Sequence, residues 1–338
     1  MRKVTIRDVA KEANVAPSTV SRVISDDSRI SDETKEKVRK IMKEMNYYPN
    51  SIARSLANNK TETIGIIMPS YTEDLFINPF FQDCFKGISS VTSKYSYDIL
   101  IAANHRNETE VDALRRLIQG NRVDGLILMR NIKNDPAIEY LIDSKCPFVI
   151  IGTSHNKSDL IPMVDNNNLQ AAYDLTRLLM EKGNRRIAFI GGDADSIVSQ
   201  MRIDGYKKAL QDSNLPFNDD YLITGDFLEQ SAYELTEELL TLPNRPEAII
   251  VMDDLMSLGV VKKVKEFKLK IPRDIMIASF NNSILSRSSN PAITSIDINS
   301  TTLGKKACNK LFKIINKDEY DTKEIVPYKI IERESTNR

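Results

Sequence analysis

The segment TIRDVAKEANVAPSTVSR at residues 5–22 constrains the fold of this chain more than any other. Thr5 and Asp8 have the three-residue spacing of a helix-capping box. The same segment has apolar residues with the spacing of one helical face: Ile6, Val9, Ala10 and Ala13. The pattern breaks at Asn14-Val15 and restarts at Pro17, which suits a first helical turn because the N–H has no acceptor there. The segment predicts two short helices joined by a tight connection.

The outer face of the second predicted helix carries small hydroxyl side chains and one cation. Four side chains are expected on that face: Ser18, Thr19, Ser21 and Arg22. A helix with such a face is suited to the major groove of DNA. The alternative is an ordinary helical hairpin with a solvated face.

A third helix is predicted after a short loop. Ser31 is its expected N-cap, and acidic residues in its first turn suit the helix dipole. Its apolar face is formed by Val38, Ile41, Met42 and Met45. Its basic residues, of which some are expected to reach phosphates and others only to be solvated, are Lys35, Lys37, Arg39, Lys40 and Lys43. Three helices around one core would complete a helix-turn-helix domain.

The charge of the chain is distributed unevenly. Residues 1–60 contain 13 Lys and Arg against 8 Asp and Glu, a net charge of +5. The rest of the chain carries −5, so that the whole has a net charge of zero. A basic head on an acidic body indicates a polyanionic partner for the head.

Length and composition indicate a soluble protein of two or three domains. The chain has 338 residues, of which 41% are hydrophobic and 28% charged. No apolar run approaches the roughly 20 residues that a membrane helix needs, and the N-terminus lacks the apolar centre of a signal peptide. We expect a cytoplasmic protein without a membrane partner.

The residues that usually carry catalysis or bind metals do not form recognisable motifs. Three distant cysteines (Cys84, Cys146 and Cys308) without a CxxC pair suggest buried thiols. The two histidines, His105 and His155, have no nearby acidic or cysteine cluster. The phosphate-binding, nucleophile-elbow and zinc-protease motifs are also missing. The sequence therefore predicts no metal, no cofactor and no enzymatic activity.

From residue 63 onward the chain alternates between short apolar strands and helical patterns. The expected strands lie in TIGIIM (63–68), YDILIAA (97–103), VDGLILM (123–129), PFVIIG (147–152), RIAFIGG (186–192), EAIIVM (247–252) and IMIASF (275–280). Nearly continuous apolar strands alternating with helices are typical of a parallel α/β sheet buried on both faces.

The first 60 residues resemble the head and hinge of the lactose/galactose-repressor (LacI/GalR) family. The matching segments are TIRDVAKEANVAPSTVSRVIS, SDETKEKV and YYPNSIARSLA, within a match of about 60 residues that contains no gap. The resemblance implies a helix-turn-helix domain at 1–49 and a hinge and linker at 50–60, which folds on operator DNA with Leu56 wedged into the minor groove. It implies DNA contacts from Thr5, Pro17, Ser18, Thr19, Ser21, Arg22, Ser31, Thr34, Tyr47, Asn50, Ala53, Arg54 and Leu56.

The rest of the chain resembles the effector-binding domain of the same family. The segments IGIIMPS, NPFF, VDGLIL, RIAFIGG and R-x-x-GY carry this looser likeness. It implies an effector-binding and dimerisation domain at 61–338 with two doubly wound parallel-sheet lobes of periplasmic-binding-protein type. The expected lobes are about 61–163 plus 291–322, and 164–290 plus 323–338.

Ligands of open α/β sheets bind beyond the carboxyl ends of the strands. Polar residues that follow predicted strands are Ser70, Asn104, Thr153, Asp253, Asp254, Asn281 and Asn282. The family resemblance adds Arg202, Phe227 and the FINPFF segment with Phe76, Asn78 and Phe80. The alternatives are loop capping for the Asn and Asp residues, core filling for Phe227 and a surface ion pair for Arg202. Many relatives carry aspartates where this chain has Phe280-Asn281-Asn282.

An aromatic, amide-rich cleft with one arginine suits a neutral, hydroxyl-rich ligand. The FINPFF pattern most resembles repressors of maltose operons, which implies maltose or a related α-glucoside as effector; trehalose, sucrose or a nucleoside are alternatives. The expected protein is a homodimer that represses a sugar operon by binding a pseudo-palindromic operator in double-stranded DNA. A cytoplasmic ligand-binding protein without a regulatory role, a transport protein and an enzyme on a Rossmann-like body are the competing hypotheses.

Overall fold

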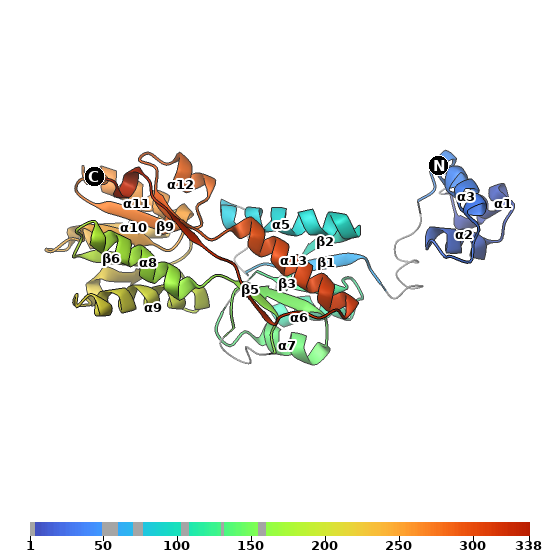
Figure 1. The fold of residues 1–338 in the computed structure, drawn as a ribbon, viewed down its shortest axis with the longest axis horizontal. Coiled ribbons are helices and arrows are strands. Elements are labelled where there is room, and N and C mark those ends of the chain that lie inside the picture. The colour runs from blue at the N-terminus through green and yellow to red at the C-terminus, as the bar shows by residue number, and fades with distance from the viewer. Residues whose placement is uncertain (1–3, 49–59, 70–76, 103–107, 130–131, 155–159) are drawn as a thin grey trace. The chain divides into compact units, whose positions relative to one another are not determined.

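The computed structural model describes residues 4–48, 60–69, 77–102, 108–129, 132–154 and 160–338. The chain folds as two compact units, Met1–Glu62 and Thr63–Arg338, which we call the head and the body (Figure 1). The predicted hinge residues 50–59 lie outside the described residues.

The head is the predicted three-helix unit. Its helices are α1 (Ile6–Ala13), α2 (Pro17–Ile24) and α3 (Asp32–Glu44). Thr5 and Asp8 form the predicted capping box, and Ser31 caps α3. The helices close on a core of Val9, Ala10, Ala13, Val20, Val23 and Val38.

The first sheet of the body is entirely parallel, with strand order β11-β5-β4-β3-β1-β2. Its strands are β1 (Thr63–Ile67), β2 (Asp98–Ala102), β3 (Gly125–Leu128), β4 (Phe148–Ile151), β5 (Met163–Asp165) and β11 (Lys323–Ile325). It carries the helices α5 (Pro79–Tyr95), α6 (Glu110–Ile118), α7 (Pro136–Ser144) and α13 (Ser300–Asn316). Side chains of β3 alternate between the core beneath α5 and α13 and the core beneath α6 and α7, which explains why this strand is apolar throughout.

The second sheet has the order β12-β10-β9-β8-β6-β7, parallel except for the β10–β12 pair. Its strands are β6 (Ile187–Gly191), β7 (Leu222–Thr224), β8 (Ala248–Val251), β9 (Met276–Phe280), β10 (Thr294–Asp297) and β12 (Lys329–Ile331). Its helices are α8 (Asn168–Glu181), α9 (Ile197–Asp212), α10 (Glu229–Thr241), α11 (Asp254–Glu266) and α12 (Ile284–Ser288), and its 3₁₀ turns are η2 (Asp219–Tyr221) and η3 (Glu334–Thr336).

The chain passes three times between the lobes that surround these sheets (Figure 1). The passages follow β5, β10 and β11. Two short strands lie in the lobe opposite to the expected one, because the chain returns later than predicted. Residues 294–297 pair with β9 in the second sheet, and residues 323–325 pair with β5 in the first.

The seven predicted strands are all present, as β1, β2, β3, β4, β6, β8 and β9. Five further strands, β5, β7, β10, β11 and β12, were not predicted, because each has only three or four residues that include a polar or charged side chain and so forms no apolar run. The three cysteines are free thiols, of which Cys84 and Cys308 are buried and Cys146 is half-buried.

Candidate DNA-binding surface and effector cleft

The outer face of α2 is exposed as predicted. Ser18, Ser21 and Arg22 are exposed and Thr19 is half-buried, while Val20 and Val23 on the opposite face are fully buried. Pro17 occupies the first turn of α2 and is exposed. The fold of the head thus presents hydroxyl groups and one guanidinium on the helix that the motif assigns to base contacts.

Three other predicted DNA contacts have structural roles in the head. Thr5 and Ser31 accept the hydrogen bonds that cap α1 and α3, and the Thr34 hydroxyl bonds to that of Ser31 at 2.9 Å. Tyr47 is half-buried against the head core, where burial raises its pKa. The predicted contacts Asn50, Ala53, Arg54 and Leu56 lie outside the described residues.

Lys35 does not extend from the outer face of α3, contrary to its interpretation as a phosphate contact. Its side chain is buried, and Nζ donates a hydrogen bond of 3.3 Å to the Asp26 carbonyl and lies 3.1 Å from the Asp26 carboxylate. Arg39 donates to the same carboxylate at 2.6 Å. These two cations lower the pKa of Asp26. Lys35 therefore fixes the loop between α2 and α3.

A cavity of about 480 Å³ lies between the two lobes of the body. Its lining comes from the carboxyl ends of nine strands, at Pro69, Met129, Gly152, Asp165, Asp193, Asp226, Asp253, Asn281 and Ile298. This is the place where open α/β sheets bind ligands. Residues Asn78, Phe80, Arg202, Phe227, Asp253 and Asn281, all predicted from the sequence, line this one cavity.

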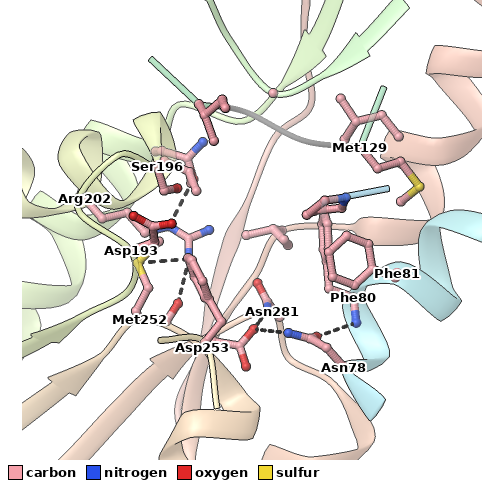
Figure 2. A pocket seen from close by; sticks show the side chains of 18 of the residues that line it. Asn78, Phe80, Phe81, Met129, Asp193, Ser196, Arg202, Met252, Asp253 and Asn281 are labelled. Carbon is pink, nitrogen blue, oxygen red and sulfur yellow. Dashed lines mark hydrogen bonds between the residues drawn. The ribbon is translucent and has the colours of Figure 1, made fainter. Parts of the chain in front are cut away.

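One side-chain cluster joins the two lobes across the cavity (Figure 2). Asn78 caps the first turn of α5 by accepting from the Phe80 N–H at 3.0 Å. Its amide donates to the Asp253 carboxylate of the second lobe at 3.1 Å, and Asn281 donates to the same oxygen at 2.5 Å. Asp253 also caps α11, so that the predicted loop-capping alternative holds together with its position in the cavity. Burial raises the pKa of Asp253 to about 6.

A second link closes another side of the cavity. Ile132 forms an isolated antiparallel bridge with Ser196. The Lys133 N–H donates to the Asp195 carbonyl at 3.1 Å. The lobes are thus connected by backbone as well as side-chain hydrogen bonds, in addition to the three passages of the chain.

Arg202 is buried in the wall of the cavity, so its interpretation as a surface ion pair is wrong. Its Nε donates to Asn168 Oδ1 at 3.1 Å. Its Nη1 donates to the Met252 carbonyl at 2.8 Å (Figure 2). The guanidinium stacks 4.0 Å from the centroid of the Phe280 ring. Burial lowers the pKa of Arg202 to about 10, an effect that Asp253 and Asp165 oppose. The group is held rigidly by its neighbours and remains positively charged at neutral pH.

Aromatic rings form part of the lining. Phe80 and Phe81 meet edge to face with 5.1 Å between their centroids. The Phe227 ring lies so close to Gly192 that a Cβ there would come within 2.3 Å of it. Glycine at 192 therefore lets the ring lie flat against the backbone after β6.

Thr153 does not line the cavity, although the sequence places it after a strand. Its hydroxyl points to the sulfur of Met163, 3.3 Å away, and the neighbouring Gly152 lines the cavity instead. The chain turns at Gly152, whose φ of 121° is strained for other residues. Ser70, Phe76 and Asn104 lie outside the described residues.

Several polar residues of the cavity were not predicted from the sequence: Asp165, Asn166, Asn168, Asp193, Ser196 and Asp226. Asp165 to Asn168 follow β5, a three-residue strand that showed no pattern. The run Asp-Asn-Asn-Asn after Met163-Val164 was nevertheless a visible signal of a polar strand end.

The cavity contains more acidic than basic groups. Six acidic residues line it: Glu110, Asp165, Asp193, Asp195, Asp226 and Asp253. The described part of its lining contains one cationic residue, Arg202. No cluster of metal-binding side chains occurs among the described residues. The resulting negative potential opposes an anionic ligand and is compatible with a hydroxyl-rich neutral one.

Comparison with known proteins agrees with this architecture. Residues 5–50 match the family described as bacterial regulatory proteins, lacI family, and residues 176–336 match the periplasmic binding protein-like domain. The HTH-type transcriptional regulator MalR of Streptococcus pneumoniae is 38% identical over 98% of this chain and 99% of its own.

Two solved structures are also similar. A probable maltose operon transcriptional repressor, MalR, from Staphylococcus aureus is 28% identical, with a TM-score of 0.75 over 83% of this chain and 99% of its own. A complex of the transcriptional regulator CelR with cellobiose is 25% identical, with a TM-score of 0.77 over 98% of this chain and 100% of its own.

The head, the two-lobed body and these relatives define a DNA-binding transcriptional regulator rather than an enzyme. The chain belongs to the LacI family, whose regulators bind operator DNA and small-molecule effectors. No helix in the described ranges is long and apolar enough to cross a membrane.

Proposed function

We propose that this regulator represses a sugar-utilisation operon and is controlled by a neutral saccharide, maltose or a related α-glucoside, bound between the lobes of the body. The observation that carries the proposal is the lining of the cavity, which combines aromatic rings with the buried, charged Arg202 and an excess of carboxylates. Carboxylates accept hydrogen bonds from sugar hydroxyls, and the guanidinium donates to them.

The names of two relatives support a saccharide. One is called a maltose operon repressor, and another was solved with cellobiose. A cavity of about 480 Å³ is within the range of small-molecule sites. Trehalose, sucrose and nucleosides are the alternative effectors.

Control of DNA binding follows from the position of the cavity. Its walls belong to both lobes, so a ligand changes the free energy of their closed arrangement relative to an open one. An effector shifts repression only through its different affinities for the DNA-competent and DNA-incompetent states. The usual coupling is about 1–3 kcal/mol, or 5–150-fold in operator affinity.

The test measures DNA affinity by fluorescence anisotropy on a palindromic duplex that the protein itself has selected from random sequences. Salt is held constant, because phosphate contacts make the affinity salt-dependent. Maltose is expected to change operator affinity at least fivefold, with maltotriose, trehalose, sucrose and a nucleoside compared in parallel. The saccharide proposal is abandoned if no sugar binds to the protein by calorimetry or changes operator affinity.

Base recognition by the head is the second part of the proposal. Arg22 is the long cation on the exposed face of α2, and arginine reads guanine with two hydrogen bonds. Arg22→Ala is expected to weaken operator binding by about 1–3 kcal/mol and to relax the preference at one position in each half-site. An equal loss of affinity for the selected and a random duplex would contradict base reading by Arg22.

A further inference from the structure

The three passages of the chain between the lobes are short and irregular. The first passage is residues 166–167, between β5 and α8. The second is residues 298–299, between β10 and α13, and the third is residues 326–328, between β11 and β12 (Figure 1). Short segments at the ends of strands and helices are where hinges absorb changes of the backbone dihedral angles. Any movement of one lobe against the other therefore takes place at these residues.

Asn166 joins the first passage to both of the others through one side-chain amide. Its Nδ2 donates to the Ile298 carbonyl of the second passage at 3.0 Å and to the Val326 carbonyl of the third passage at 2.8 Å. The amide group has two protons, and both are used in these bonds. Asn166 is only 3% exposed, so water competes little for them. One buried side chain thus ties all three passages together.

Other hydrogen bonds join the passages in pairs. The Val326 N–H donates to the Asp165 carbonyl at 2.8 Å, which links the third passage to the end of β5. The Asn299 side-chain amide donates to the Pro327 carbonyl at the longer distance of 3.4 Å, which links the second passage to the third. The first and second passages are linked by the bond that Asn166 donates. Asn166 is therefore the residue on which the joining of all three passages depends.

The tie at Asn166 differs from the contacts between the lobes across the cavity. Those contacts, such as the bond from Asn78 to Asp253, join side chains that are far apart in sequence and belong to opposite lobes. They break when the lobes separate. The bonds of Asn166 join the passages to one another, so the lobes can rotate about this point without breaking them.

We propose that Asn166 is a positioning residue that makes the three passages act as a single hinge, and that this hinge carries the effect of the ligand to DNA binding. The inference rests on the proposed saccharide effector and names the residue on which regulation by that effector depends. Without the tie, each passage can bend by itself, and a ligand in the cavity no longer imposes one arrangement of the lobes. Asn166 lines the cavity, but neither proton of its amide is free to donate to a ligand.

The test uses Asn166→Ala and Asn166→Asp in the full chain. Alanine removes the amide group, whereas aspartate keeps its shape but presents an oxygen instead of two donors to the carbonyls. We expect saturating maltose to change the operator affinity of either variant less than twofold, against at least fivefold for the wild type. Anisotropy at constant salt measures this effect. Calorimetry should still detect maltose binding, with an affinity within tenfold of the wild-type value.

The matched control is Asn184→Ala. Asn184 is 1% exposed, and its side-chain amide donates to the Leu179 carbonyl at 2.8 Å, within the second lobe. Its replacement should lower the Tm as the replacement of Asn166 does, because each removes a buried hydrogen-bond donor. It should leave the effect of maltose on operator affinity unchanged. The comparison separates a role in the hinge from a loss of stability.

Hydrogen exchange of the wild type tests the single hinge without any substitution. The Asn299 N–H of the second passage donates to the Asp297 carboxylate at 2.8 Å, and the Val326 N–H of the third passage donates to the Asp165 carbonyl. If the passages open together, the opening equilibria of these two amides should agree within fivefold, with and without maltose. A larger difference, or a change with maltose in one passage alone, would overturn the inference.

The outcomes separate this inference from the proposed function. If the wild type binds no saccharide, the effector class is wrong, and the hydrogen exchange of the passages still tests the hinge. If maltose changes the operator affinity of the Asn166 variants as much as that of the wild type, the proposed function stands and the single hinge is wrong. If Asn184→Ala loses the effect of maltose as fully as the Asn166 variants, the loss reflects stability, and the inference is overturned.

Discussion

Arg202 combines a structural and a proposed binding role in one side chain. Its Nε donates to Asn168 and its Nη1 donates to the Met252 carbonyl, while the planar face of the guanidinium stacks on the Phe280 ring. These contacts use part of its five donors and leave others for a ligand. Lysine has a single ammonium group and cannot reproduce the planar geometry.

Arg202→Lys is expected to abolish the effect of sugar on operator affinity. It should leave operator affinity without sugar nearly unchanged, because the substitution lies in the body. The lost hydrogen bonds should also reduce the free energy of unfolding by about 1–3 kcal/mol. Anisotropy with and without maltose and urea denaturation measure the two effects. If maltose still changes the operator affinity of the variant as it does that of the wild type, the effector does not bind at Arg202.

Asn281 supports Asp253 with an amide rather than with a second carboxylate. Its amide donates to Asp253 at 2.5 Å, so an aspartate there would place two carboxylates in contact. Its φ of 100° is unusual for a residue other than glycine, and asparagine tolerates positive φ better than most. The asparagine therefore allows Asp253 to accept hydrogen bonds from both lobes.

The raised pKa of Asp253 predicts a pH dependence that Asn281→Asp should enlarge. A carboxyl group with a folded pKa near 6 and an unfolded pKa of 3.8 stabilises the fold below pH 3.8, and this contribution is lost as the pH rises through 6. We expect Asn281→Asp to lower the Tm at pH 7.5 much more than at pH 4.5. Thermal denaturation across this range decides it, and an equal loss at both values would contradict a charge effect.

At the scale of elements, α3 shows that basic residues on one helix can have different roles. Lys35 is buried against Asp26, whereas Lys37 is exposed on the same helix. Removal of the Lys35 ammonium would leave the negative charge of the Asp26 carboxylate with less compensating positive charge beside it. An exposed lysine mainly contributes charge toward a polyanion.

Lys35→Ala is therefore expected to destabilise the head, seen as a lower Tm of its helical unfolding transition. Lys37→Ala should leave this Tm within error and weaken binding to selected and random duplexes alike. It should also reduce the slope of log affinity against log salt by about 1. If Lys35→Ala keeps the wild-type Tm and lowers only the salt slope, Lys35 acts on phosphate after all.

On the scale of the whole molecule, the body has apolar side chains at one edge. Strand β2 is the edge strand of the first sheet, where Ile101 is 42% exposed, and Phe85 on the neighbouring α5 is 37% exposed (Figure 1). Exposed apolar edges are typical of protein interfaces. A pseudo-palindromic operator also requires a protein with two-fold symmetry.

We expect a dimer that associates through the bodies at this edge. Ile101→Lys should shift the protein toward monomer and weaken operator binding, whereas the equivalent change at exposed Leu160 should do neither. Light scattering at micromolar concentration measures the assembly. A wild-type monomer or tetramer, or a dimer that Ile101→Lys does not affect, would contradict this arrangement.

The sequence by itself determined the head and the class of the body. The capping box of α1 and the apolar stripes of its helices depend on residues three or four apart, so their physics is local. The longer buried strands were equally visible, because a strand covered on both faces is apolar throughout. Strand ends also indicated Asp253 and Asn281 among the cavity residues, since parallel strands bring their carboxyl ends to one edge.

Only the tertiary structure decided which polar groups meet. Asn166 bonds to carbonyls 132 and 160 residues further along the chain, and no local pattern predicts such contacts. The direction of a side chain also escaped the sequence: Lys35 turns inward to Asp26, and Thr153 turns to Met163. The contacts of Asn168 with Asp165 and Arg202 depend on how separate segments of the chain pack together, because burial and hydrogen bonding are properties of the assembled fold rather than of residue order.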